Sequence, residues 1–473
     1  MARGSALQIS IENDATAKRH WSASHHSILY RFPPPAKAEL PVAVPSGNQR
    51  ECYNWGALNF GNPMELFLFD DIERPDEGPA SYAESKFGYL NRTGRPEAGR
   101  VRENLENWFS HYPQHQRAEF RSRFRSPNNH QHLAAFFELA LHELLIRLGH
   151  GVEIHPASNG ATAKRPDFLV TSGSGDRFYM EAVLATDQTD QEAAANARLA
   201  TLRDLLNRMD SPNFFVGFEQ GGTPKTSFPA NKIQAFLEQK LSALDPDEVA
   251  AAFASGGIRS LPHWPYDHDG CIVTFFPIPK SAGKRGKAGV RPVGMQMESP
   301  HWIEPELAIR NAITKKARRY GKLDLPYIIA VDAIGDHVEH SDIMEALFGK
   351  ETTIVSRTAS GFKMQPSRIP DGAWRSKTAP RYTTVSAMLL FHPLFPHSLC
   401  HTDVRLYHHP WARLPYSGEL ARLPQAIPRR ETNKMESIEG ESLTSIFELT
   451  ANWPYNDAVT GSEADLISAN RQP

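Results

Sequence analysis

Apolar residues along the chain recur first at helical spacing and then at strand spacing. Residues 131–149 carry the clearest helical pattern, which Gly149 or Gly151 can end. The apolar face of this predicted helix consists of Phe137, Leu141, Leu144, Leu145 and Leu148. Three strand-like runs follow, "VEIHP", "DFLV" and "RFYMEAVLA", then a helix-length segment, "QEAAANARLATLRDLLNRM", and another strand, "NFFVGFE". The pattern predicts the order α-β-β-β-α-β over residues 131–219.

Composition and pattern together divide the chain into five regions. Residues 1–50 are predicted to form an irregular, proline-rich arm, because proline disfavours both helices and central strands. A helical region follows at 51–130, the α-β-β-β-α-β core at 131–220, and a second α/β region at 221–425. The polar composition of residues 426–473 predicts a tail that is disordered in part. The predicted fold class is therefore α/β, and the sequence leaves open whether the later strands extend the first sheet or build their own.

The composition excludes several classes of protein. Hydrophobic residues make up 40% of the 473 residues and aromatic residues 10%, which is enough for packed cores. The 52 Lys and Arg residues nearly balance the 54 Asp and Glu residues, so any basic surface has to be local. The three cysteines are far apart, and no apolar run approaches the roughly 20 residues of a membrane span. We expect a soluble, cytoplasmic protein without a membrane partner.

Two carboxylates lie on neighbouring predicted strands. Asp167 precedes "FLV", and Glu181 lies within "RFYMEAVLA", beyond a glycine-serine turn. Glu138, at the flank of the apolar face of the preceding helix, can turn toward the same sheet. Oxygen ligands of this kind suit Mg²⁺ or Mn²⁺, which keep their other positions for water and phosphate. Each residue alone would also suit a turn, a strand edge or a solvated helix flank, so only their arrangement in one segment indicates a metal site.

In this arrangement residues 131–219 resemble the PD-(D/E)XK, or restriction-endonuclease-like, superfamily. The resemblance implies an αβββαβ fold in which Asp167 is the PD aspartate, Glu181 the acidic residue of the third strand, and Glu138 the helical glutamate. It also implies that Asp167 and Glu181 hold the metal, that Glu138 assists, and that the reaction is phosphodiester hydrolysis, with a role in genome defence. The rest of the chain resembles bacterial proteins that cannot be tied to an activity.

Val183 departs from the family pattern, which has a lysine two residues after the acidic residue of the third strand. That lysine helps to orient or polarise the attacking water beside the metal, and valine cannot do so. Another lysine could take this role, the metal could suffice, or the domain could bind without cutting. Lys164, three residues before Asp167, is the nearest replacement in sequence, and Lys315 or Lys316 on a later predicted helix are others. Neighbouring arginines stay charged and cannot act as bases.

Three further segments carry other candidate chemistry. The loop at 280–292 could follow a phosphate backbone or be a solvated loop. Its basic residues are Lys280, Lys284, Arg285, Lys287 and Arg291. The helix ending in "TKKARRYGK" places basic residues where they suit the helix dipole without any ligand. The segment "HSLCHTDVRLYHH" lacks the paired spacing of structural zinc sites, so we expect no zinc there.

The sequence and this resemblance together predict a nuclease that depends on Mg²⁺ or Mn²⁺ and acts on nucleic acid; DNA is favoured over RNA, but the sequence does not decide between them. Asp167 and Glu181 are the predicted metal ligands, and Glu138 and Lys164 are the further predicted catalytic residues. The alternative, which Val183 favours, is a catalytically inactive module that keeps the nuclease fold and binds nucleic acid or a protein partner. A third interpretation, a metal-dependent enzyme acting on another substrate, is compatible with the near-neutral charge.

Overall fold

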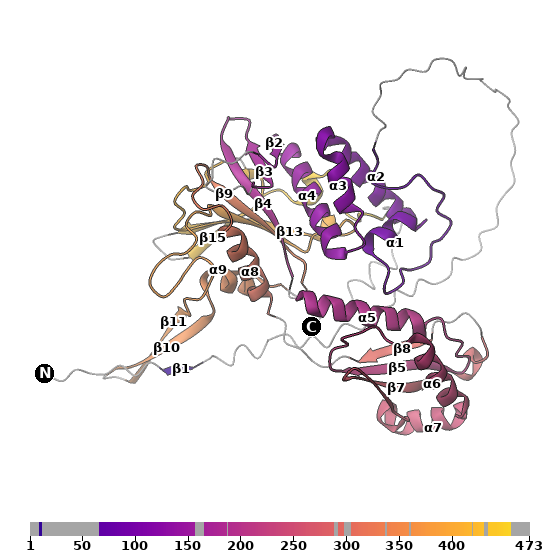
Figure 1. Ribbon diagram of the computed structural model, residues 1–473. Coiled ribbons are helices and arrows are strands. Elements are labelled where there is room, and N and C mark those ends of the chain that lie inside the picture. Colours follow the sequence, from indigo (N-terminus) through magenta and orange to yellow (C-terminus); the bar gives the residue numbers. More distant parts are fainter. Residues whose placement is uncertain are drawn as a thin grey trace, which may run out of the picture.

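A mixed β-sheet with helices on both faces forms the centre of the fold (Figure 1). The computed structural model describes residues 9–11, 66–156, 165–186, 188–287, 292–297, 304–335, 338–358, 361–418, 420–429 and 434–455. The central sheet has eight strands in the order β15-β14-β13-β12-β9-β4-β3-β2. They are β2 (Gly151–Ile154), β3 (Phe168–Thr171), β4 (Arg177–Ala185), β9 (Tyr327–Ala333), β12 (Ala387–His392), β13 (Asp403–His408), β14 (Gln425–Arg429) and β15 (Lys434–Ile438). β2, β3 and β4 are antiparallel neighbours, and β9 runs parallel to both β4 and β12.

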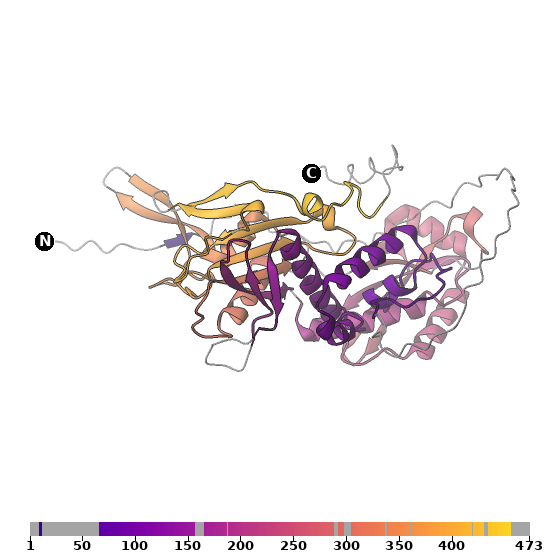
Figure 2. The same cartoon turned by 90° about the horizontal axis from the view of Figure 1, so that it is seen from above.

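Each face of this sheet is covered by its own helices (Figures 1 and 2). The helices on one side are α1 (Lys86–Arg92), α2 (Pro96–His111), α3 (Arg117–Phe124) and α4 (Asn129–Arg147), and those on the other are α8 (Pro305–Ala317) and α9 (His340–Phe348). β4 contributes to both layers, since Phe178 and Met180 face α4 while Tyr179 and Ala185 belong to the core beneath α8. A strand covered on both faces has to be largely apolar, and every residue of β9 is buried.

The predicted helix at 131–149 and the three strands after it are confirmed. α4 begins after Asn128, whose side chain accepts hydrogen bonds from the N–H groups of His130 and Gln131. The helix ends at Arg147, and Gly149 follows with a positive φ of 86°, a conformation that commonly ends helices. β2, β3 and β4 then form the antiparallel part of the central sheet.

The chain between residues 190 and 297 forms a separate unit, which corrects the predicted position of the fourth strand (Figure 1). Its elements are α5 (Asp190–Leu206), β5 (Phe214–Gly221), α6 (Ala230–Ser242), α7 (Pro246–Gly256), β6 (Trp264–His268), β7 (Cys271–Pro279) and β8 (Val293–Met297). The strand order is β6-β7-β5-β8, so the strand predicted at 213–219 pairs with β7 and not with the central sheet. The strand parallel to β4 is β9, which α8 precedes. The predicted boundary between residues 220 and 221 therefore falls inside this inserted unit.

Local sequence explains why β5 does not lie beside β4. Gly217 leaves room for the ring of Phe276 on β7, because a Cβ at this position would lie 2.2 Å from that ring. The far end of β5 is polar, with Glu219 exposed, whereas β9 is buried along its whole length. A strand with a polar end does not suit the centre of a sheet that is covered on both faces. Spacing along the chain predicts that a strand exists but does not say which sheet it joins.

Part of the predicted polar tail belongs to the core, which corrects the boundary at residue 426. β14 and β15 form one edge of the central sheet, and the short helix α10 (Leu443–Ile446) follows them. Phe447 is 3% exposed, and its ring centroid lies 4.7 Å from that of Trp108 on α2. A few apolar residues in a polar stretch are thus sufficient to fix the chain against the N-terminal helices. Residues 456–473, and the predicted arm at 1–50 apart from β1 (Ile9–Ile11), lie outside the described residues.

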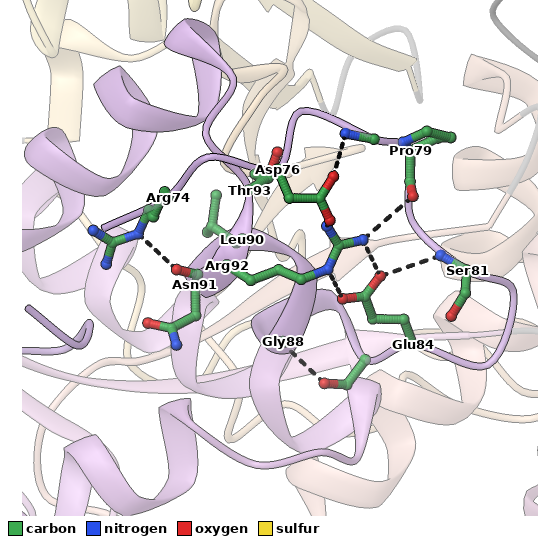
Figure 3. Close-up of polar contacts among 12 residues, drawn as sticks. Arg74, Asp76, Pro79, Ser81, Glu84, Gly88, Leu90, Asn91, Arg92 and Thr93 are labelled. Atoms are coloured by element: carbon green, nitrogen blue, oxygen red, sulfur yellow. Dashed lines mark hydrogen bonds and ion pairs between the residues drawn. The ribbon is translucent and has the colours of Figure 1, made fainter. Parts of the chain in front are cut away.

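The loop before α1 is fixed to that helix by two arginines (Figure 3). Arg92 donates hydrogen bonds to Glu84 at 2.5 Å and to Asp76 at 2.6 Å. Arg74 donates from Nε to the carbonyl oxygen of Asn91 at 2.7 Å. Charge-assisted hydrogen bonds of this geometry set the course of the loop, although partly exposed ion pairs add little stability.

A β-hairpin of β10 (Glu351–Thr358) and β11 (Gly361–Arg368) follows α9. In both views it projects away from the central sheet (Figures 1 and 2). β1 pairs with the other edge of β10, so the projecting sheet has the order β1-β10-β11.

Candidate functional site

Glu181 lies within β4, at the interface between the central sheet and α8. It follows Tyr179 and precedes Val183 on the strand face that packs against α8, and its exposed fraction is 0%. β4 pairs with β9 at this position, whereas its ladder with β3 ends at Met180, one residue before Glu181. An ionised carboxylate in such a place needs charged or hydrogen-bonding partners.

The end of α8 supplies these partners. Nζ of Lys316 lies 2.5 Å from Oε1 of Glu181, and a terminal nitrogen of Arg319 lies 3.1 Å from the same oxygen. The hydroxyl of Tyr320 is within hydrogen-bond distance of Oε2. Lys316 belongs to the last turn of α8, and Arg319 and Tyr320 lie in the bend that follows the helix, so one short segment reaches a single carboxylate. Glu181 is therefore bound by two cations and a hydroxyl.

Tyr320 connects the site to the segment before β3. Its hydroxyl oxygen also lies 2.8 Å from the carbonyl oxygen of Arg165, and its single proton can be donated to only one acceptor at a time. Burial and, next, the charge of Glu181 raise the pKa of Tyr320, so the hydroxyl stays protonated and acts as a donor.

Asp167 is the second carboxylate of the site. Its N–H lies 3.3 Å from Oε2 of Glu181, and its Oδ2 accepts a hydrogen bond from the N–H of Ala182 at 2.8 Å. It is half-buried, whereas Glu181 is fully buried. Burial and, next, the charge of Glu181 raise the pKa of Asp167 to about 7, while Lys316 and the Ala182 N–H oppose this rise. The structure thus brings the two predicted metal ligands into contact.

Glu138 is held by other partners. It is 6% exposed on α4, which covers the opposite face of the sheet from α8. Tyr112 donates to its Oε1 at 2.5 Å, and Arg123 binds both carboxylate oxygens, at 2.6 and 3.1 Å. Within the described residues no hydrogen bond joins Glu138 to Asp167 or Glu181. The charge of Glu138 nevertheless adds to the rise in the pKa of Asp167. The structure thus gives Glu138 a role in fixing α3 against α4, and its part in the chemistry of the carboxylate pair stays a prediction.

The structure separates the candidate lysines. Lys164 lies outside the described residues. Lys315 is exposed, whereas the next residue, Lys316, points its ammonium group at Glu181. Val183 packs against the core beneath α8, so the position two residues after Glu181 is filled by an apolar contact. A lysine is thus present at the carboxylates although the strand does not provide it.

The basic loop at 280–292 is in part structural. Lys280 is 2% exposed, and its ammonium donates to the carbonyl oxygen of Ser211 at 2.6 Å. Arg285 donates to Asp247 at 2.7 Å. Burial lowers the pKa of Lys280. These two residues are therefore not available to bind a phosphate backbone, and Arg291 lies outside the described residues.

The pair formed by Asp167 and Glu181 can accept a hard divalent cation, because one carboxylate oxygen of the pair is still available. Oδ1 of Asp167 accepts no hydrogen bond from the residues that the structure describes, and this side chain is only half-buried. Mg²⁺ is commonly held by one or two carboxylates, with water and phosphate oxygens completing its shell. In the described ranges, the candidate site included, no group of three or more His, Cys, Asp or Glu side chains is placed to hold a metal ion.

Arg319 and Tyr320 were not expected at this site. The sequence shows them in "KKARRY", directly before a strand of apolar residues, but basic residues at the end of a helix also suit the helix dipole. Their contact with Glu181 depends on the packing of α8 against β4. These two elements are separated along the chain by the whole inserted unit. A glutamate in the middle of an apolar strand is the signal that basic residues from elsewhere in the chain are needed.

Comparisons with protein-family models, with curated proteins and with solved structures find no match to this chain. Along the described ranges, no helix combines the length and the apolar character that crossing a membrane requires.

Proposed function

We propose that this chain is a metal-dependent nuclease of the PD-(D/E)XK type in which α8 provides the catalytic lysine. Its reaction adds water across one P–O ester bond of a nucleic acid and gives a phosphomonoester and an alcohol. The observation that carries this proposal is the position of Lys316, whose Nζ lies 2.5 Å from Oε1 of Glu181 and whose charge reaches Asp167.

The strand order supports the same proposal. α4, the antiparallel strands β2, β3 and β4, then α8 and the parallel strand β9 reproduce the order α-β-β-β-α-β. Asp167 directly precedes the second strand of this set, and Glu181 lies on the third. These are the positions that the resemblance requires. The unit between residues 190 and 297 is then an insertion between the third strand and the second helix.

Asp167 and Glu181 are the residues that would hold Mg²⁺ or Mn²⁺. Such an ion, when bound, lowers the pKa of a coordinated water and offsets negative charge on the phosphate. The ammonium group of Lys316 lies beside the two carboxylates, where it opposes the rise in the pKa of Asp167 and can attract a phosphate group. Arg319, with the Tyr320 hydroxyl, keeps Glu181 in a fixed orientation.

One observation favours a second candidate function, a nuclease-fold module that binds nucleic acid or a protein without cutting. Both oxygens of Glu181 already accept hydrogen bonds, and the side chain is fully buried. Such a group can be satisfied as an internal ion pair without a metal. Under this second function Lys316 is only a structural partner of Glu181.

Cleavage assays on the full chain distinguish the two functions. Supercoiled plasmid, linear duplex and RNA are incubated with Mg²⁺ or Mn²⁺, and samples with a chelator serve as blanks. We expect metal-dependent cleavage by the wild-type protein and a loss of about a hundredfold or more in Lys316→Met, because a preorganised charge is removed. Lys315→Met, a change at the exposed neighbouring lysine, is the matched control and should cleave like the wild type.

Two results would contradict the proposal. A folded wild-type protein that cleaves none of these substrates with either metal supports the binding module instead. Cleavage by folded Lys316→Met at the wild-type rate would remove Lys316 from the catalytic machinery.

A further inference from the structure

We infer that the hairpin of β10 and β11 is a nucleic-acid-binding arm, which contacts bases through Phe362 and Met364 and phosphates through Arg357 and Lys363. The choice of nucleic acid as the ligand rests on the proposed function. The hairpin itself is independent of the carboxylate site, since none of its residues contributes to Asp167 or Glu181.

Two apolar side chains on β11 are unusually accessible. Phe362 is 75% exposed and Met364 is 69% exposed, the two largest fractions among the large hydrophobic residues that the structure describes. Neither belongs to the two hydrophobic cores that lie against the central sheet. The hairpin itself projects away from that sheet (Figures 1 and 2). Grouped apolar residues that face solvent commonly mark an interaction site.

The register of the hairpin places a cation beside these apolar residues. Arg357 pairs directly with Phe362, and Val355 pairs with Met364. Directly opposed residues of two antiparallel strands point to the same face, and alternate pairs share that face. One face of the ribbon therefore carries an aromatic ring, two aliphatic side chains and a guanidinium group. Such a set can stack on bases and bind the adjoining phosphate.

The charges near the end of the hairpin are not compensated within the described residues. Arg357 and Lys363 are both exposed, and neither forms an ion pair with another residue of the described ranges. Near the base of the hairpin, by contrast, Arg368 forms an ion pair with Glu351. The positive charge is thus concentrated at the end that projects furthest, which suits a polyanion.

The base of the hairpin is fixed to the helix that carries the candidate lysine. Arg310 of α8 donates to the carboxylate of Asp371 at 3.0 Å, three residues after β11 ends. At the other strand, Gly349 turns the chain from α9 into β10 with a φ of 95°, and a Cβ there would lie 1.8 Å from the carbonyl oxygen of Ile369. A nucleic acid held by the hairpin is therefore held relative to α8, from which Lys316 reaches Glu181.

A second copy of the chain is a poorer occupant of this surface. β11 is an edge strand within the described residues, but it carries Lys363 and Pro366, two residue types that discourage pairing between edges. Two copies meeting through this face would also bring two Arg357 side chains into one interface. A two-stranded ribbon fits the major groove of a duplex, and apolar side chains can insert between bases.

The test measures binding by the full chain in a chelator, so that cleavage does not interfere. Fluorescence anisotropy is recorded with a short labelled duplex DNA, the corresponding single strand, and an RNA of the same sequence, over a range of salt concentrations. We expect Phe362→Ala/Met364→Ala to weaken binding to the preferred probe by about tenfold or more, because contacts with the bases are lost. Arg357→Ala/Lys363→Ala should weaken binding and lower the salt dependence by about two counterions.

The matched control is Ile354→Ala/Gln365→Ala, a directly paired position on the face of the ribbon opposite Phe362 and Met364; Lys363, which pairs with Ser356, is also on this face and is left unchanged. It should bind like the wild type. Binding by both hairpin variants at the wild-type level, or no binding of any probe by the wild type, would overturn the inference. The inference would also be overturned if Phe362→Ala/Met364→Ala bound nucleic acid like the wild type but changed its oligomeric state, as measured by light scattering.

If Lys316→Met and the wild type both fail to cleave while hairpin-dependent binding persists, the nuclease proposal fails and this inference stands.

Discussion

The ammonium group of Lys316 lies 2.5 Å from a carboxylate oxygen of Glu181, although 135 residues separate them along the chain. The inserted unit from residue 190 to residue 297 accounts for most of that separation. The contact exists because β4 and β9 are parallel neighbours and α8, which connects into β9, covers both strands. A parallel pair requires a crossover connection, and a long insertion before the crossover helix does not alter its final position.

Removing the Lys316 charge should lower the stability of the folded protein in addition to its cleavage activity. Glu181 is fully buried, and in Lys316→Met it would keep only Arg319 as a cationic partner. We expect the free energy of unfolding in urea to fall by about 1–3 kcal/mol, because a buried charge loses part of its compensation. Lys315→Met should change it by less than about 0.5 kcal/mol.

A double variant tests the electrostatic origin of this loss. Glu181→Gln placed in the Lys316→Met background removes the uncompensated charge, so stability should partly recover relative to the single Lys316→Met variant. If the double variant is less stable than the wild type by the sum of the losses measured for Lys316→Met and Glu181→Gln alone, the two residues do not act as a pair.

Asp167 should be required for binding of a divalent metal. In isothermal titration of Mg²⁺ or Mn²⁺ into the full chain, we expect Asp167→Asn to lose the binding heat, because the half-buried carboxylate is the accessible ligand. Asp176→Asn, an exposed carboxylate in the turn between β3 and β4, should bind metal like the wild type. Equal heats for Asp167→Asn and the wild type would show that the metal, if it binds, lies elsewhere.

Glu138 should affect stability and not metal binding. Glu138→Gln weakens the charge-assisted hydrogen bonds from Arg123 and retains an acceptor for Tyr112, so we expect a loss of about 1–3 kcal/mol in the free energy of unfolding. Glu119→Gln, which removes the exposed second partner of Arg123, should cost less. A Glu138→Gln protein of unchanged stability that no longer binds metal would identify Glu138 as a ligand.

Local patterns were sufficient to predict the elements around the site. The periodicity of α4 and the short apolar runs of β2, β3 and β4 gave the correct order, because each of these segments has a strong preference of its own. The proximity of Asp167 and Glu181 follows from the same information, since β3 and β4 are neighbours joined by a turn. Contacts within a hairpin depend on few residues and are therefore accessible from sequence.

Contacts that depend on distant packing were not predictable in the same way. The spacing that placed Glu138 at the flank of a helix could not show that Tyr112 and Arg123, both on the N-terminal side, would bind it. The same limit applies to β5 and β9, both of which have strand-like sequences. Only the packing of complete units decides which of them joins β4. The choice between Lys315 and Lys316 depends on the rotation of α8 against the sheet.

Phe447 should be important for stability although it lies in a polar stretch. Its ring is 3% exposed and packs against Trp108, so Phe447→Ala should lower the free energy of unfolding by about 3–5 kcal/mol through lost burial and a residual cavity. Ile438→Ala, at a 41% exposed position on β15, should have a much smaller effect. Similar stabilities for the two variants would mean that the segment after β15 does not contribute to the core.

Asp332 should make stability depend on pH independently of the candidate site. This β9 residue is 1% exposed, and burial raises the pKa of its carboxyl to about 8, although the N–H of Leu394, 3.0 Å from Oδ1, opposes the rise. Between about pH 4 and pH 8 the folded protein keeps a proton that the unfolded chain releases. The contribution of Asp332 to the free energy of unfolding therefore falls as the pH rises through this window, by at most about 1.4 kcal/mol per pH unit.

Asparagine does not titrate and still presents an oxygen to Leu394, so the stability of Asp332→Asn relative to the wild type should increase from pH 4 to pH 8 and then remain constant. Asp403→Asn, at an exposed position on β13, should show a constant difference from the wild type over the same range. Parallel stability curves for Asp332→Asn and the wild type would mean that Asp332 is ionised in the folded protein throughout.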